Sequence, residues 1–283
     1  MTASLPFLDA GAVAAALDPA GAVDALEHAL RTGLDPEADP PRGVMALDGG
    51  GELLVMPSAA GGTAAVKLVT VGGAPRIQGV CVVFDPVTLA PAAVIDGIAL
   101  TNLRTAAVSA LAVRRLVAPG ARRLLVFGRG PQGLAHVAAV RAVLPTIDHV
   151  DVVGRDAADV GALVAAADVI CCCTTARTPL FDGALVADHA TVVAVGSHER
   201  DAREVDAALV GRATVLVESR PTALREAGDI ILAIAEGAIG PDDLTVLSDA
   251  PRPPDPSRPR FFKSTGMAWE DAVVAAAVAG LRR

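Results

Sequence analysis

The stretch RRLLVFGRGPQGLAH, residues 122–136, decides the fold of this chain. An apolar run, Leu124 to Phe127, is followed at once by three glycines, at 128, 130 and 133, and then by a stretch rich in alanine and valine. This order predicts a buried strand, a glycine turn and a helix. In a dinucleotide-binding unit the glycines allow a tight turn, a close approach to a pyrophosphate and close packing of helix on strand, with the phosphates at the helix N-terminus. The stretch therefore favours a dinucleotide site over a purely structural turn.

Further apolar runs follow this turn, separated by segments that can form helices. They cover residues 150–153, 168–173, 191–195 and 214–218. The alternation predicts an α/β domain over residues 119–263, built as a Rossmann-type doubly wound parallel sheet whose ligands gather at the carboxyl ends of the strands. The segment between Arg155 and Asp168 is too short for a usual helix and strand, so we expect the sheet to be shortened and one edge strand to be missing.

The rest of the chain predicts a second, α+β domain. Residues 8–31 read as two short helices broken at Asp18-Pro19, a capping residue followed by proline at the first helical position. Short runs punctuated by paired or triple glycines over residues 44–94 predict an antiparallel or barrel-like sheet. We expect the run that contains Phe261-Phe262-Lys263 to lead into a final apolar helix and not to form a strand. We expect this helix to return to the first domain, which then comprises residues 1–118 and 264–283.

Composition excludes several classes of protein. The 283 residues carry a net charge of -8 and only 2% aromatic residues, which removes the basic, ring-bearing surface of a nucleic-acid-binding protein. No apolar run reaches the roughly 18 residues that span a bilayer, and no signal peptide is visible, so we expect a cytoplasmic protein without membrane contacts. The adjacent cysteines 171–173 lack metal-ligand spacing and read as small buried hydrophobes, and the histidines show no pairing. The sequence predicts no metal site.

Two cations stand out in the first domain. Lys67 interrupts the apolar run of residues 64–71, so its ammonium must face solvent or meet an anion. Arg104 follows Thr101, which can cap a helix, and would then lie in the first turn, where the helix dipole opposes a cation. An arginine in that place is either an ordinary surface residue or a ligand for a carboxylate. A third cation, Arg42, lies in a loop just before a strand.

The expected ends of two strands in the second domain bear on the cofactor and on proton transfer. The strand over 150–153 is followed by Gly154, where NAD-binding proteins usually place an acid, and by Arg155, which favours NADP(H) over NAD(H), although Asp156 blurs this preference. After the strand over 191–195, His198 is a candidate proton donor near the nicotinamide, with simple solvation as the alternative.

The chain resembles the ornithine cyclodeaminase/mu-crystallin family over nearly its whole length. The stretches that carry the resemblance are Met56-Pro57, residues 67–70, Asp96-Gly97, Leu100-Thr101, residues 104–107, the turn of residues 128–136, Gly196 with Arg203-Glu204, residues 226–229, and Ser264, Gly266, Ala268 and Glu270-Asp271. The resemblance implies a homodimer whose first domain supplies the dimer interface and the substrate pocket. It also implies that Arg42, Lys67 and Arg104 grip a substrate carboxylate. The nicotinamide cofactor would lie against Gly128, Gly130, Pro131, Gln132, Gly133, Arg155, Thr174, Gly196 and Ser197.

Two departures from the family pattern bear on the substrate. Ornithine cyclodeaminases have an acid two positions before Met-Pro, where this chain has Leu54, and an aspartate where it has His198. Both differences remove anionic partners of a diamine. We therefore expect an NAD(P)H-dependent reductase of a C=N bond next to a carboxylate, acting on an imino acid, or an amino-acid dehydrogenase in reverse, with Lys67 and His198 as catalytic residues. The alternatives are a cyclodeaminase with catalytic NAD and a non-catalytic NADP- or small-ligand-binding protein.

Overall fold

The chain forms two compact units, which we describe separately. The computed structural model describes residues 5–250, 255 and 257–281. Unit 1 comprises the described residues up to Val108 and from Met267 onward, and unit 2 comprises those between Ser109 and Gly266. The boundaries predicted from the sequence lie at 118/119 and 263/264. The sequence also predicts an exposed loop rich in proline, arginine and aspartate over residues 250–260, and part of it lies outside the described residues.

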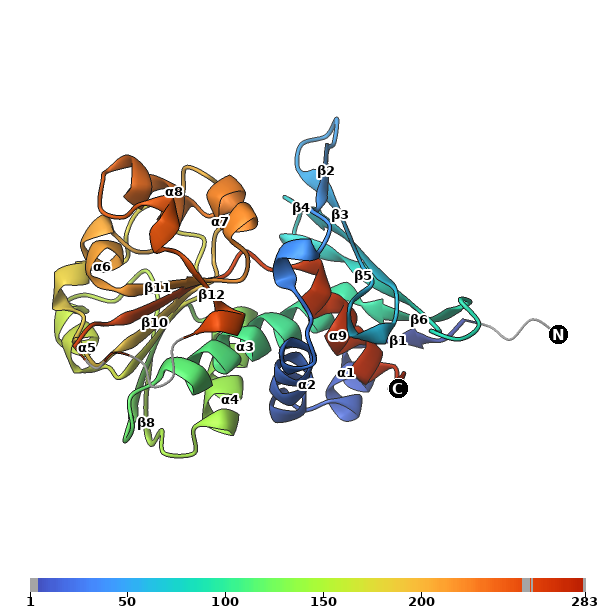
Figure 1. The fold of residues 1–283 in the computed structure, drawn as a ribbon, viewed down its shortest axis with the longest axis horizontal. Coiled ribbons are helices and arrows are strands. Elements are labelled where there is room, and N and C mark those ends of the chain that lie inside the picture. The colour runs from blue at the N-terminus through green and yellow to red at the C-terminus, as the bar shows by residue number, and fades with distance from the viewer. Residues whose placement is uncertain (1–4, 251–254, 256, 282–283) are drawn as a thin grey trace. The chain divides into compact units, whose positions relative to one another are not determined.

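Unit 2 is built on a seven-stranded sheet in which every pairing is parallel, with the order β12-β11-β13-β10-β9-β7-β8. Helix α4 lies on one face of the sheet, and α6 and α8 lie on the other (Figure 1). This arrangement confirms the Rossmann-type fold, and in the described residues the sheet ends at β8. The strands are β7 Arg123–Phe127, β8 His149–Val153, β9 Val169–Cys172, β10 Thr191–Ala194, β11 Thr214–Val217, β12 Thr245–Val246 and β13 Arg260–Lys263. The helices are α4 Pro131–Val143, α5 Gly161–Ala166, α6 Ala207–Arg212, α7 Arg220–Glu226 and α8 Gly228–Ala235, with short 3-10 turns η3 Gly183–Leu185, η4 Pro241–Asp243 and η5 Leu247–Asp249.

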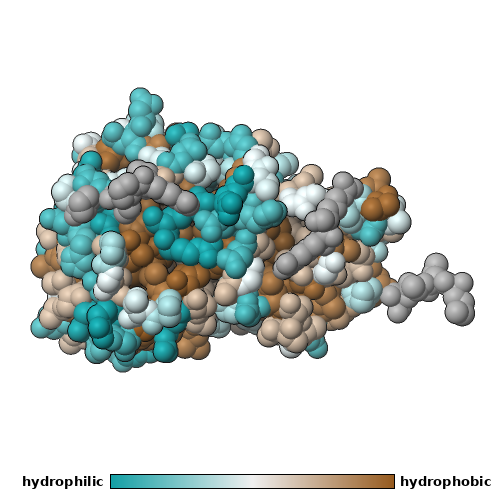
Figure 2. Space-filling view, turned by 60° about the horizontal axis from the view of Figure 1, so that its bottom comes forward, coloured by the Kyte–Doolittle hydropathy of each residue, from teal (hydrophilic) through white to brown (hydrophobic). Residues whose placement is uncertain are grey.

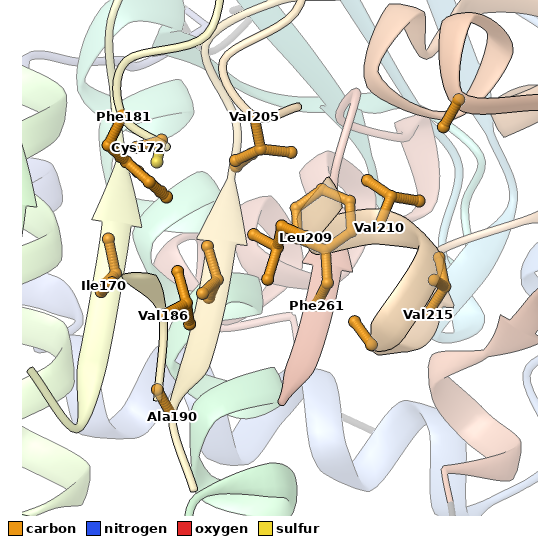
Figure 3. Packing of buried hydrophobic residues seen from close by; sticks show 14 of the residues in the cluster. Ile170, Cys172, Phe181, Val186, Ala190, Val205, Leu209, Val210, Val215 and Phe261 are labelled. Atoms are coloured by element: carbon orange, nitrogen blue, oxygen red, sulfur yellow. The ribbon is translucent and has the colours of Figure 1, made fainter. Parts of the chain in front are cut away.

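A hydrophobic core cluster of unit 2 packs side chains of this sheet against helices α5, α6, α7 and α8. Ile170 and Cys172 of β9 and Phe261 of β13 are buried with Leu209 and Val210 of α6 (Figure 3). Burial raises the pKa of the neighbouring Cys171 thiol to about 12, so that side chain stays neutral. The prediction of small buried hydrophobes is confirmed for Cys171 and Cys172, whereas Cys173 is half-buried.

Strand β13 corrects one prediction. The run Phe261-Phe262-Lys263, expected to lead into the last helix, forms a strand between β10 and β11. The preceding Arg260 is 1% exposed, and its guanidinium donates to the backbone carbonyls of Leu116 and His189. These partners are far away in sequence, so a local pattern of four residues could not reveal them.

Unit 1 contains a six-stranded sheet with the order β1-β6-β5-β4-β3-β2, antiparallel except for the parallel pair β1 and β6. The expected antiparallel sheet and the two N-terminal helices are confirmed. Helix α9 packs against β3, β4 and β5, and α2 packs against α9. The strands are β1 Phe7–Leu8, β2 Gly43–Ala46, β3 Glu52–Ser58, β4 Ala65–Val71, β5 Ile77–Phe84 and β6 Pro91–Asp96; the helices are α1 Ala10–Ala16, α2 Pro19–Arg31 and α9 Ala268–Val278, with 3-10 turns η1 Pro36–Ala38 and η2 Ala60–Gly62.

Helix α3, Gly97–Leu116, corrects a second prediction. The carboxylate of Asp96 accepts hydrogen bonds from the backbone N–H groups of Ile98 and Ala99, each at 2.9 Å, so the helix begins before Thr101. Thr101 therefore lies inside the helix and does not cap it. Arg104 lies beyond the first turn, where the dipole of the helix N-terminus no longer acts on it. The argument that placed Arg104 in an unfavourable first turn was wrong.

The surface displays hydrophilic residues with hydrophobic patches among them on the face shown in Figure 2. Within the described ranges no helix is long and apolar enough to cross a membrane.

Candidate functional site

Lys67 belongs to the buried face of the unit 1 sheet. Side chains alternate between the two faces of a strand, and on β4 the buried set is Ala65, Lys67 and Val69. The ammonium is therefore directed to the face that carries the core, and the side chain is only 2% exposed. Cys81, its partner in register on β5, is fully buried beside it. Of the two readings of Lys67 left open by the sequence, the one in which it meets an anion is correct.

The anions that Lys67 and Arg104 meet come from the first turn of helix α9. Lys67 Nζ lies 2.8 Å from Asp271 Oδ1 and 2.7 Å from Oδ2. Arg104 Nη1 donates to Glu270 Oε2 at 2.7 Å, and Arg104 Nε lies 3.0 Å from Asp271 Oδ1. The structure thus brings two predicted cations together, with two carboxylates, in one buried cluster of unit 1.

The sequence alone did not assign a role to Glu270 or Asp271. They lie in an otherwise apolar helix rich in alanine and valine and are 0% and 1% exposed. Two adjacent acids in such a helix were the available signal, because carboxylates are almost never fully buried unless they are paired. Their position in the first helical turn also stabilises their charge through the helix dipole.

Burial makes the proton of Lys67 easier to lose. Desolvation and the neighbouring Arg104 guanidinium lower the pKa of Lys67 to about 8, although Asp271 acts in the opposite direction. The same burial, together with Asp271, raises the pKa of the Cys81 thiol to about 12, so Cys81 stays neutral. Lys67 can therefore hold an anion as a cation and can also exchange a proton near neutral pH.

Arg42 lies just before one strand of the unit 1 sheet, and Leu54 lies on the next. Arg42 directly precedes β2 and is half-buried. Its part in carboxylate binding stays a prediction. Leu54 on β3 is 4% exposed and packs with Met56, Val69 and Ala268. An apolar cluster thus occupies the position where a cyclodeaminase would need an acid.

The glycine turn of unit 2 has the geometry that the sequence predicts. Gly128 has a φ of 117°, and a Cβ there would lie 2.5 Å from the carbonyl oxygen of Cys173. A Cβ at Gly133 would lie 1.9 Å from the carbonyl oxygen of Gly128. A Cβ at Gly130, the residue that precedes α4, would meet no atom within 4 Å, and Pro131 opens the helix. The backbone is closely packed at Gly128 and Gly133, and there is open space at Gly130. This arrangement fits a pyrophosphate at the N-terminus of α4.

Two arginines lie at the end of the neighbouring strand β8. Arg129, from the glycine turn, donates to both oxygens of Asp156, at 2.7 and 3.0 Å. Arg155 donates to the hydroxyl of Thr175 at 3.3 Å. A Cβ at Gly154 would lie 2.8 Å from Asp156 Oδ1 and 3.0 Å from Arg129 Nη1, which are the ends of two exposed side chains. This edge of unit 2 is rich in guanidinium groups that an added phosphate could bind.

A buried network joins the turns at the carboxyl ends of β9, β10 and β13. Glu204 accepts hydrogen bonds from the backbone and hydroxyl of Thr174 at 2.8 and 2.7 Å and from the backbone of Gly196 at 2.7 Å. Asp229 accepts from the backbone of Glu204 and binds Lys263, whose ammonium donates to the carbonyl of Ser197 at 2.8 Å. The predicted cofactor residues Thr174, Gly196 and Ser197 are thus tied together. His198 follows directly, half-buried, and its catalytic role stays a prediction.

The chain is similar to several known proteins over most of its length. A model of the ornithine cyclodeaminase/mu-crystallin family matches residues 8–162 and 155–280. The chain is 34% identical over 232 residues to the Delta(1)-pyrroline-2-carboxylate reductase of Colwellia psychrerythraea, covering 72% of this chain and 73% of that protein. It is 36% identical over 249 residues to the ketimine reductase mu-crystallin of Mus musculus, covering 80% and 79%. It shares its fold with the Delta(1)-pyrroline-2-carboxylate reductase of Thermococcus litoralis in complex with NADH and L-proline, with a TM-score of 0.88, 23% identity, and 98% and 97% of the two chains covered.

Proposed function

Because the chain belongs to the ornithine cyclodeaminase/mu-crystallin family, we propose that it is an NAD(P)H-dependent reductase of a C=N bond adjacent to a carboxylate. Its relatives named Delta(1)-pyrroline-2-carboxylate reductase and ketimine reductase support a cyclic imino acid as the substrate. In the reverse direction the same chemistry oxidises an amino acid. The product of reduction is a cyclic secondary amine that carries the same carboxylate.

The observation that carries the proposal is the buried pair Lys67 and Arg104. Lys67 and Arg104 are 2% and 6% exposed, and their charged groups share the carboxylate of Asp271. An arginine fork and an ammonium form short, charge-assisted bonds to a carboxylate. Fixing the substrate in this way orients the neighbouring C=N carbon, which lowers the entropic part of the barrier. Arg42 is the third candidate for this grip.

The proton on the imine nitrogen makes the neighbouring carbon a better hydride acceptor. Lys67 is able to supply such a proton because its pKa of about 8 lies close to neutral pH. His198, which follows β10, is the second candidate donor, directly or through a water molecule. These assignments give Lys67 two tasks, since it first holds the carboxylate and then exchanges a proton.

The dinucleotide that supplies the hydride would be held by unit 2. Gly128, Gly130 and Gly133 leave room for its pyrophosphate, with Pro131 and Gln132 in the first turn of α4. Thr174, Gly196 and Ser197 lie on the turns nearest the expected nicotinamide. We infer a preference for NADP(H), because Arg129 and Arg155 flank the end of β8 and Gly154 replaces the usual acid.

Cyclodeamination of ornithine is the rival function. It would release ammonia without net oxidation of the cofactor, and it would require a partner for the distal amine of the substrate. Leu54 is buried in an apolar cluster and offers none. Burying a charged amine without a partner costs several kcal/mol, which favours a substrate without a distal cation.

The test is a spectrophotometric assay with the purified full chain. We expect NADPH absorbance to fall on addition of pyrroline-2-carboxylate or piperideine-2-carboxylate, with a smaller rate for NADH. Ornithine with NAD serves as the rival substrate, and ammonia is measured in parallel. Ammonia release without cofactor oxidation would favour the cyclodeaminase. Cofactor binding in a thermal-shift assay without any turnover would favour a binding protein.

We further propose a homodimer formed through the edge of the unit 1 sheet. All four residues of the edge strand β2 are exposed, and Val44 and Met45 expose 57% and 59% of their surface. An apolar edge strand left open to solvent promotes unwanted pairing, and a second copy of the chain would cover it. Light scattering is expected to give twice the chain mass, and Met45→Glu should weaken the dimer. A monomeric wild type would contradict this proposal.

A further inference from the structure

Asp271 is the residue that both cations of the cluster share. Its Oδ1 lies 2.8 Å from Lys67 Nζ and 3.0 Å from Arg104 Nε. Its side chain is 1% exposed, so water does not compete for these contacts. Glu270, the preceding residue on α9, binds Arg104 Nη1 at 2.7 Å, whereas the Lys67 ammonium forms its ion pair with Asp271. The two acids thus have different partners although they are neighbours on one helix.

The charged and titratable groups around Lys67 come from several elements of unit 1. Arg104 approaches from α3 and Asp271 from α9, and Cys81 faces it from β5. Glu270 reaches the cluster through Arg104. Asp39, which follows η1, accepts a hydrogen bond from the backbone of Trp269 and is coupled electrostatically to Asp271. Among these groups, Asp271 is the carboxylate in direct contact with the ammonium.

We propose that Asp271 is a positioning residue for the reaction: it holds the Lys67 ammonium beside Arg104 and keeps it protonated until the imine nitrogen takes the proton. This inference rests on the proposed function. Lys67 gives one proton to the imine nitrogen, the carbon receives the hydride from the dinucleotide, and the lysine regains a proton from water. Without the carboxylate, Arg104 and the apolar surroundings would both favour the neutral amine.

The sequence makes this inference directly measurable. Lys67 and Lys263 are the only lysines in the 283 residues. A protein labelled with ¹⁵N at the lysine Nζ atoms therefore gives two side-chain signals, and the signal that is lost in Lys67→Met belongs to Lys67. The pH titration of the Lys67 signal then reports its proton without any substrate or cofactor.

The experiment compares Asp271→Asn with Glu270→Gln. Each variant removes one negative charge from the same helical turn, but only the first removes the direct partner of Lys67. We expect the titration midpoint of Lys67 to fall by about one pH unit or more in Asp271→Asn and to stay near that of the wild type in Glu270→Gln. The pH at which kcat/KM falls on the alkaline side of its pH profile should shift together with the Lys67 midpoint in Asp271→Asn. It should not shift in Glu270→Gln. An unchanged midpoint in Asp271→Asn, or an equal shift in both variants, would overturn the inference.

A measurement on the wild type keeps the inference testable if Asp271→Asn does not fold. In a protein that also carries ¹³C in its aspartate carboxyl groups, a scalar coupling across the hydrogen bond between Lys67 Nζ and the Asp271 carboxyl carbon is expected, and its absence at pH 7 would contradict the contact. Failure of the proposed function has a different signature. In that case the Lys67 midpoint would still respond to Asp271→Asn, while no imine would be reduced by the wild type.

Discussion

The two lysines of this chain are both buried beside an aspartate, but their surroundings differ. In unit 1, Lys67 binds Asp271 and also faces the guanidinium of Arg104 across that carboxylate. In unit 2, Lys263 binds Asp229 at 2.8 Å and donates to the backbone carbonyl of Ser197. One ammonium thus lies beside a second cation, and the other has a carboxylate and a backbone oxygen.

Under the proposed function, this difference distinguishes Lys67, which takes part in the chemistry, from Lys263, which stabilises the fold. Asp229 also accepts from the backbone N–H groups of Glu204 and Val205, so the Lys263 pair is part of a hydrogen-bonded framework. Lys67 and Arg104 repel each other, and a substrate carboxylate would stabilise both. We therefore expect changes at Lys67 to affect turnover and changes at Lys263 to affect stability.

The largest expected effect is that of Lys67→Met on turnover. Removing the ammonium eliminates one carboxylate contact and one proton donor, so kcat/KM for the cyclic imine should fall by about 10³-fold or more. Asp271 keeps Arg104 as a partner, so the fold should survive, and circular dichroism checks this. Steady-state oxidation of NADPH measures the rate. Activity within about tenfold of the wild type would remove Lys67 from the mechanism.

Lys263→Met is expected to act on stability. It leaves the buried carboxylate of Asp229 without its cation, and breaking a buried ion pair in this way costs about 3–5 kcal/mol. Denaturant unfolding should therefore show a lower free energy for Lys263→Met than for Lys67→Met. A lower free energy of unfolding for Lys67→Met than for Lys263→Met would contradict the assignment of Lys263 to stability.

The smallest of the three effects is expected at the exposed end of β8. Arg155→Ala should raise the KM for NADPH by about tenfold, because a charge-assisted hydrogen bond to a phosphate is lost, and it should leave the KM for NADH almost unchanged. Arg141→Ala, on the last turn of α4, is a matched control at a distance from the glycine turn. An equal rise in the KM for NADPH and in the KM for NADH would argue against a phosphate site at Arg155. Thermal stability should not change in either variant.

Much of the fold could be predicted from local sequence patterns. The glycine turn, the apolar runs after it and the capped start of α2 at Asp18-Pro19 act over a few residues, and the structure has each of them. Strand β13 could not be predicted, because its pairing with β10 and β11 and the partners of Arg260 are distant in sequence. The start of α3 was misplaced because Asp96 and Thr101 are both good caps, and the structure uses Asp96.

For the site, the sequence identified charges in unusual places but not their partners. Lys67 stands out because it interrupts an apolar strand, and its burial follows from the alternation of side chains. Asp271 follows Lys67 by 204 residues in the sequence. The two residues meet because α9 packs on the sheet. Local patterns carry no information about such a contact.

The most direct test of the central claim is deuterium transfer from [4,4-²H₂]-NADPH to pyrroline-2-carboxylate, analysed by mass spectrometry and NMR of the product. Hydride delivery to the carbon next to the carboxylate predicts proline with one deuterium at carbon 2, and Lys67→Met should form it far more slowly. Proline without deuterium at carbon 2, or ammonia released from ornithine with no net oxidation of the cofactor, would contradict the claim.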